Sequence, residues 1–265
     1  MNRLFASARI FVSSSWLAYV QLFAWSEPST YVASVILAPL TYMVFFIYLG
    51  LSSKGSNTAD FYIVGNALQM ASMTGVLGVT MTIANERDWG SLIYLIGSPA
   101  NRLLIFLGRA SFNVLNGIVV VGVCFGWGML LGLDLSRANL PGLALTILMV
   151  ALSTSGLGLL IGSISLMSLN VTFVTNLMFF GLLVFTGANL SFDKMPGWMQ
   201  SFGTILPLTR GIQSARLLVK GASLAEVLPL LAGELAVGLV YALVGFFVFR
   251  WVEFQARRHG TLEAF

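Results

Sequence analysis

A series of long apolar segments, separated by short polar ones, constrains this chain more than any other feature. A membrane-spanning helix needs about 20 mostly apolar residues to cross a hydrocarbon core of roughly 30 Å. Six segments of the 265-residue sequence meet that requirement: 31–51, 61–84, 103–133, 140–163, 171–190 and 225–252. The sequence therefore predicts an all-α polytopic membrane protein with six transmembrane helices, forming a single transmembrane domain over residues 1–265.

The composition excludes several functional classes. Hydrophobic residues make up 57% of the chain and charged residues only 9%, whereas a soluble domain carries about 25% charged residues. One histidine (His259), one cysteine (Cys124) and no phosphate-binding loop motif are present, which argues against metal centres, Ser-His-Asp catalysis and nucleotide binding. We expect no enzyme activity, no catalytic residue, no cofactor and no metal in this chain. Its 14 basic residues do not cluster as a nucleic-acid site would require.

The distribution of basic residues predicts the orientation. An even number of spans places both termini on one side, and both ends of the chain are basic, with Arg3 and Arg9 at the start and a basic tail over 250–259. Loops rich in Lys and Arg face the cytoplasm. We therefore expect a multi-pass protein of the cell inner membrane with both termini cytoplasmic.

Residues 2–27 precede the first predicted span. The segment is apolar but is interrupted by Arg9, by the serines at 13–15 and by Gln21. We interpret it as a helix lying in the membrane interface, with Trp16 among the aromatic residues at headgroup level. A seventh span or an uncleaved signal is the alternative. Pro28 should end this helix before the first crossing.

Residues 191–220 lie between the fifth and sixth predicted spans. The segment is moderately apolar and is cut by Pro196, Gly197, Gly203 and Pro207. This pattern favours an extracellular re-entrant hairpin of two short helices, because non-helical backbone at membrane depth requires cover from protein or a water-filled cavity. A loop resting on the membrane surface is the alternative. The candidate functional residues of the hairpin are Pro196, Trp198, Pro207, Arg210 and Arg216.

Residues 85–99 form a charged stretch between the second and third predicted spans. Asn85 can cap a helix whose first turn carries Glu86 and Asp88, where acidic groups stabilise the positive end. One apolar helical face follows and Pro99 ends the helix; the face consists of Trp89, Leu92, Ile93 and Ile96. The pattern predicts a short amphipathic cytoplasmic helix, for which an ordinary interfacial anchor is the simplest interpretation.

The same stretch resembles a known family signature. The sequence E-R-D-W-G-S-L-I-Y-L-I-G-S-P over 86–99 is similar to the E-R-x-x-G-[ST]-L-x-x-L-x-x-[ST]-P signature of type-2 ABC exporter permeases, the membrane subunits of drug, polysaccharide and lipid export systems. The stretch Pro207-Leu208-Thr209-Arg210 also resembles the P-L-T-x of that family. The likeness extends over nearly the whole chain, from the interfacial helix to the hairpin before the last span.

The resemblance implies a role for residues 85–99 as a coupling helix that docks on a separate ABC ATPase subunit. The residues to which the role is carried are Glu86, Arg87, Asp88, Trp89, Gly90, Ser91, Leu92, Leu95 and Pro99. Two positions depart from the family pattern, because Trp89 stands where a second basic residue is common and Ile93 where an acid is common. The implied assembly pairs this permease subunit with a second copy or a homologous permease. Two ATPase subunits bind the ATP and Mg²⁺.

Glu234 lies about ten residues into the last predicted span. An ionisable group near the bilayer midplane is a functional hypothesis by default: it could contact a substrate, carry a proton, pair with Arg210 or Arg216, or only hold helices together. An ion-coupled secondary transporter with Glu234 as its proton site is therefore the main alternative to an ATP-driven exporter, and an assembly protein is a third. The apolar interior favours an amphiphilic substrate: a drug, a lipid or a lipid-linked glycan.

Overall fold

The computed structural model describes residues 2–25, 27–52, 58–88, 90, 102–166 and 170–259. The described residues form helices and connecting segments. In chain order the elements are α1 (Asn2–Trp25), α2 (Pro28–Ser52), α3 (Ala59–Asp88), α5 (Arg102–Leu130), α6 (Leu140–Ser165), α7 (Val171–Phe185), the 3₁₀ turn η1 (Phe192–Lys194), α8 (Gly197–Ile205), α9 (Thr209–Val219) and α10 (Leu224–His259).

Five of the helices are long and apolar enough to cross a membrane: α2, α3, α5, α6 and α10. They correspond to five of the six predicted spans, which supports a polytopic membrane protein. At 1.5 Å per residue, the 36-residue helix α10 is about 54 Å long. This length exceeds the hydrocarbon core, so α10 extends beyond the membrane at one end or both.

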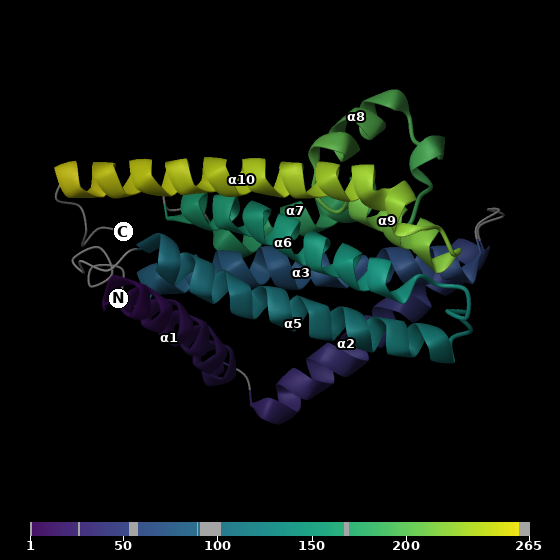
Figure 1. Ribbon diagram of the computed structural model, residues 1–265, viewed down its shortest axis with the longest axis horizontal. Helices are drawn as coiled ribbons and strands as arrows, with labels where there is room; N and C mark the ends of the chain where they lie inside the picture. Colours follow the sequence, from purple (N-terminus) through teal and green to yellow (C-terminus); the bar gives the residue numbers. More distant parts are fainter. Residues whose placement is uncertain are drawn as a thin grey trace.

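The bundle is organised around α3, which runs side by side with α5 and α6, while α10 packs along α6 (Figure 1). Within the apolar part of α3, 72% of the residues are buried, against 17% in α2 and 22% in α10. The helices approach closely where glycine replaces a side chain. A Cβ on Gly156 of α6 would lie 2.3 Å from the Gly238 carbonyl oxygen of α10, and one on Gly158 would lie 2.8 Å from the Gly75 carbonyl oxygen of α3.

The fifth predicted span, 171–190, is shorter in the structure. Helix α7 ends at Phe185 after 15 residues, about 22 Å at 1.5 Å per residue, and the chain continues to Leu190 in a series of bends. Gly187 has φ 84°, which ends the regular helix. Two backbone carbonyl groups of this buried segment find donors elsewhere in the chain, because Arg216 donates hydrogen bonds to the carbonyl oxygens of Gly187 and Ala188.

The N-terminal segment forms a helix distinct from the first span. Helix α1 ends at Trp25 and α2 begins at Pro28, so the predicted break before the first crossing is confirmed. Helix α1 lies obliquely along α5 (Figure 1), and the hydroxyls of Ser15 and Ser111 are 2.9 Å apart. It is not among the five helices that qualify as spans, and its location in the membrane interface stays a prediction.

Two short helices, α8 and α9, precede the last span and form the predicted hairpin. Pro196 precedes α8, and Pro207 lies in the turn between α8 and α9. Two hydrogen bonds connect α9 with α8. The Thr209 hydroxyl donates to the Gly203 carbonyl oxygen (2.5 Å), and Arg210 Nη1 donates to the Thr204 carbonyl oxygen (2.9 Å). The predicted helices are therefore present. Their depth in a membrane stays a prediction.

One local prediction is wrong. Asn85 was expected to cap a separate helix starting at residue 85, but it lies inside α3, which continues to Asp88. The acidic residues Glu86 and Asp88 therefore belong to the last turn of α3 and not to the first turn of a new helix. The helix continues because Asn, Glu and Arg are tolerated inside a helix, and the sequence has no glycine or proline between Gly78 and Gly90 to end it.

Candidate functional site

The proposed coupling segment begins at the end of α3. The backbone of Glu86, Arg87 and Asp88 forms the last turn of that helix, and Gly90 follows in a turn with φ 67°. A positive φ suits glycine, and it is not a helical conformation, so Gly90 does not continue α3. The remaining predicted coupling residues lie outside the described part of the chain: Trp89, Ser91, Leu92, Leu95 and Pro99.

The end of α3 that leads to this segment is fixed to α5 by polar contacts. Arg109 of α5 is buried, and its Nη1 donates to the Thr82 carbonyl oxygen of α3 at 3.2 Å. Asn113, one turn further along α5, donates through Nδ2 to the Thr82 hydroxyl at 3.3 Å. These bonds join α3 to α5 at Thr82, a few residues before Glu86. A displacement of the segment after α3 would therefore reach both helices.

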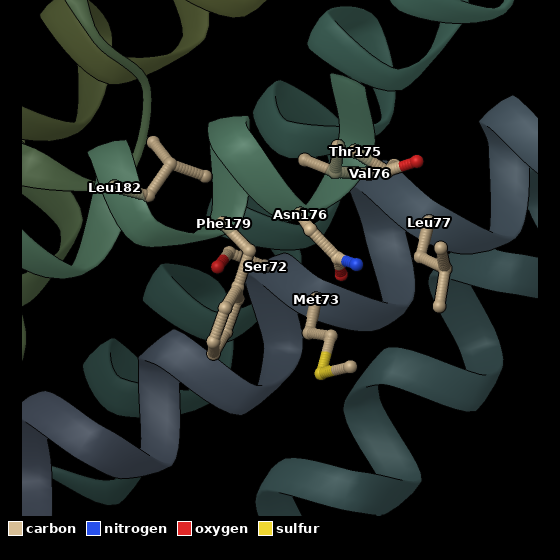
Figure 2. A pocket seen from close by; sticks show the side chains of 8 residues that line it. All are labelled: Ser72, Met73, Val76, Leu77, Thr175, Asn176, Phe179 and Leu182. Carbon is tan, nitrogen blue, oxygen red and sulfur yellow. The ribbon is translucent and has the colours of Figure 1, made fainter. Parts of the chain in front are cut away.

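A small pocket opens between the middle of α3 and α7 (Figure 2). Its lining combines apolar and neutral polar side chains, four from each helix: Ser72, Met73, Val76, Leu77, Thr175, Asn176, Phe179 and Leu182. Figure 2 shows Asn176 extending from α7 toward α3, near Met73. None of the eight lining residues is charged. The sequence reasoning missed this site, although polar Ser72 and Asn176 inside apolar segments were a usable signal.

Amide side chains connect α3 with α7 and the segment after it, beside the pocket. Gln69 Nε2 donates to the Phe179 carbonyl oxygen at 3.3 Å, and Asn66 Nδ2 donates to Asn189 Oδ1 at 2.9 Å. Asn66, Gln69 and Ser72 are fully buried. The α3 face toward α7 is thus polar over about two turns.

Arg216 of the hairpin fixes the end of α7. Its Nη1 donates to the Gly187 carbonyl oxygen at 2.8 Å. Its Nη2 donates to the carbonyl oxygens of Ala188 (2.8 Å) and Phe61 (3.0 Å). Burial lowers the pKa of Arg216 to about 9, so the guanidinium remains charged at neutral pH. The structure therefore places this predicted residue in a structural role, joining α9, α3 and the segment after α7.

The other predicted hairpin residues lie apart from that contact. Trp198 is 60% exposed and packs its ring against Phe185 at a centroid distance of 6.0 Å. Arg210 lies in the first turn of α9 and donates to the Thr204 carbonyl oxygen. Trp198, Arg210 and Arg216 therefore contact three different parts of the bundle and do not form one site.

Glu234 is fully buried in α10. Its Oε1 accepts hydrogen bonds from the Ser153 hydroxyl and the Leu208 amide, both at 2.5 Å, and its Oε2 accepts one from the Gly211 amide at 3.2 Å. Neither Arg210 nor Arg216 supplies any of these three bonds. The carboxyl group lies at the first turn of α9, where a negative charge is favourable to a helix.

Among the residues that the structure describes, long apolar helices form a bundle with a neutral pocket and with two short helices before the last span. A profile of the ABC-2 type transporter family matches residues 15–219. The chain belongs to this family of ABC transporter permeases.

Curated relatives agree with that assignment. The chain is 24% identical over 216 residues to the probable doxorubicin resistance ABC transporter permease protein DrrC of Mycobacterium tuberculosis, found in two strains. The match covers 79% of this chain and 78% of the relative. The protein is thus a membrane transport permease of the type-2 ABC class, as its sequence signature predicted.

Proposed function

We propose that this chain is the membrane subunit of an ATP-driven exporter, energised through residues 85–99 by separate ABC ATPase subunits. Two copies, or this chain and a homologous permease, enclose the path, and the ATPases bind the ATP and Mg²⁺. In this assembly the chain performs no covalent chemistry. Its place is the cell inner membrane, with both termini and the coupling segment on the cytoplasmic side.

One observation supports this proposal above the others: a single helix carries both the pocket and the start of the coupling segment. Four residues in the middle of α3 line the pocket: Ser72, Met73, Val76 and Leu77. Residues 86–88 form the last turn of the same helix. The 14 residues from Ser72 to Glu86 correspond to about 21 Å of helix. Because α3 is the most buried span, a push on its end moves the pocket wall as part of a rigid body.

The pocket is our candidate for part of the translocation path. Large apolar residues of α7 are exposed beside it, including Phe180 (58%) and Leu177 (53%). Asn176 and Thr175 add hydrogen-bonding groups to the same helix. Polar groups within a membrane segment are placed where they meet protein, water or a ligand. A second subunit facing α7 would complete an enclosed path at this surface.

The lining indicates the class of substrate. Apolar side chains provide most of the pocket, with the hydroxyls of Ser72 and Thr175 and the amide of Asn176 as hydrogen-bonding groups. Enlarged by a second subunit facing α7, a lining of this kind would suit an amphiphile that is held by apolar contact and oriented by a few hydrogen bonds. We therefore place drugs, lipids and lipid-linked glycans in the substrate class, with a planar drug as the first to test.

An ion-coupled secondary transporter would use Glu234 as its proton site. The carboxyl group is fully buried, and the chain itself supplies a donor to each of its oxygens. This geometry supports a positioning role for Glu234 and disfavours a proton path through it.

Inverted membrane vesicles test the proposal. The chain is expressed with the ATPase encoded beside it, and vesicle uptake of doxorubicin is followed by fluorescence. We expect uptake that requires ATP, is lost when the phosphate-binding lysine of the ATPase is replaced by alanine, and persists when nigericin collapses the pH gradient. Uptake that follows the pH gradient and needs no ATPase would establish the secondary transporter instead.

A further inference from the structure

The turn between α8 and α9 contains a strained residue. Leu208 has φ 84°, and it is the single non-glycine residue with positive φ in the part of the chain that the structure describes. Such a conformation is unfavourable for a leucine and persists only where surrounding contacts hold it. Leu208 is fully buried in the main apolar core. Its backbone amide donates to Glu234 Oε1 at 2.5 Å.

Glu234 therefore connects three helices at one carboxyl group. It belongs to α10, accepts from the Ser153 hydroxyl of α6, and accepts from the amides of Leu208 and Gly211 at the start of α9. The two amides are among the groups at a helix start that have no partner within the helix. The carboxyl group thus satisfies the first turn of α9 and anchors it to the α6–α10 pair.

The surroundings of Glu234 leave no room for a ligand. A Cβ on Gly211 would lie 2.1 Å from Val150 Cγ2 of α6, and one on Gly238 would lie 2.4 Å from the Ser153 Cα atom. Helices α6, α9 and α10 are therefore in direct contact around the carboxyl group. A group so enclosed and fully hydrogen-bonded serves to hold the chain rather than to bind a substrate.

Glu234 supplies the polar contact between the first turn of α9 and the α6–α10 pair, while the other end of α9 packs on α10 through Leu218, Val227 and Leu231. Helices α8 and α9 are tied together by the bonds from Thr209 to Gly203 and from Arg210 to Thr204. On its other side, α8 meets α7 through the aromatic rings of Phe185, Trp198 and Phe202. The ring contacts are apolar, whereas the Glu234 hydrogen bonds are directional.

We propose that Glu234 is a positioning residue that latches the α8–α9 hairpin to α6 and α10, so that the hairpin and these two spans move as one body during transport. The inference deepens the proposed function, and its transport consequence rests on it. The latch itself is a property of this chain and can be measured without the ATPase.

Amide hydrogen exchange of the purified protein in lipid nanodiscs tests the latch. Glu234→Gln keeps the shape but places an amide NH₂ opposite backbone donors. We expect exchange at residues 206–213 to rise about tenfold or more, the factor that leaving a buried backbone donor without its hydrogen bond gives. Exchange in α3 should stay unchanged. Ser153→Ala removes one bond only and should give a smaller rise at the same residues.

The matched control is Glu226→Gln. Glu226 is an exposed glutamate at the start of the same helix, where it accepts from the Ser223 hydroxyl at 2.6 Å. This variant should leave exchange at 206–213 as in the wild type. If Glu234→Gln is not recovered as folded protein, Ser153→Ala carries the test. The latch would be overturned if Ser153→Ala, and any recovered Glu234→Gln, exchanged at residues 206–213 at the wild-type rate. It would also be overturned if exchange rose equally throughout the molecule.

Vesicle transport with the ATPase present gives the second readout. A loosened hairpin should lower doxorubicin uptake in Glu234→Gln while ATP hydrolysis by the complex continues, and Glu234→Asp should restore part of the uptake. Lost uptake with unchanged exchange at 206–213 would overturn the latch and return Glu234 to a role in substrate or proton contact. Uptake that needs no ATP in the wild type would contradict the proposed function and leave the exchange result standing.

Discussion

The guanidinium of Arg216 stacks over the ring of Phe61, with Cζ 3.4 Å from the ring centroid, while its nitrogens reach the carbonyl oxygens of Phe61, Gly187 and Ala188. One side chain of the hairpin thus joins the start of α3 to the chain just after α7. The contact explains how α7 can end after 15 residues without leaving buried carbonyl groups unsatisfied.

Replacing Arg216 should therefore destabilise the bundle. Arg216→Ala leaves carbonyl groups buried without donors, and we expect a loss of about 2 to 4 kcal/mol. Arg216→Lys should recover only part of the loss, because an ammonium group cannot reproduce the planar fork and the stacking. Thermal unfolding in nanodiscs, followed by tryptophan fluorescence, measures both. The control is Arg137→Ala at an exposed position in the loop before α6, and equal unfolding temperatures for the Arg216 and Arg137 variants would refute this role.

Helix packing gives a matched pair of glycine variants. Gly238→Ala places a Cβ 2.4 Å from Ser153 Cα at the α6–α10 contact, and overpacking of this kind should destabilise by about 1 to 3 kcal/mol. Gly122 of α5 has no atom within 4 Å of an added Cβ. Gly122→Ala should be neutral or stabilising by up to about 1 kcal/mol, through helix propensity. Thermal unfolding of the two variants checks the prediction, and a Gly238→Ala protein as stable as Gly122→Ala would show that α6 and α10 are not packed this closely.

The pocket between α3 and α7 predicts a transport phenotype without a stability phenotype. Met73 is 38% exposed and lines the pocket, so Met73→Trp should fill it and reduce doxorubicin uptake several-fold. Val119→Trp adds similar bulk at an exposed position of α5 away from the pocket and serves as the control. Uptake measured in vesicles, normalised to the amount of folded protein, separates the two. Unchanged uptake in Met73→Trp would remove this pocket from the path.

Much of the fold follows from sequence because apolar length and helix breakers act locally. Five predicted spans, the break at Pro28 and the two helices on either side of Pro207 are all present. The early end of α7 and the continuation of α3 past Asn85 were not predicted. The first depends on Arg216, 29 residues after Gly187, and the second on the absence of any strong helix breaker before Gly90.

The site shows the same division between local and long-range information. Glu234 was recognised as unusual because a lone carboxyl group in an apolar span is unusual in any sequence. Its partners could not be foreseen, because Ser153 lies 81 residues away and the two amides belong to a backbone turn that only the folded chain creates. The α3–α7 pocket likewise combines residues about 100 positions apart.

Co-purification with the ATPase tests the central claim most directly. The tagged wild-type chain and the double variant Glu86→Ala/Arg87→Ala are each expressed with the ATPase encoded beside them, and the ATPase retained on the permease and its ATP hydrolysis are measured. The account predicts a stable complex with the wild type that the double variant loses, while the variant permease itself stays folded. An ATPase that fails to bind the wild type, or binds both equally well, would contradict coupling through residues 85–99.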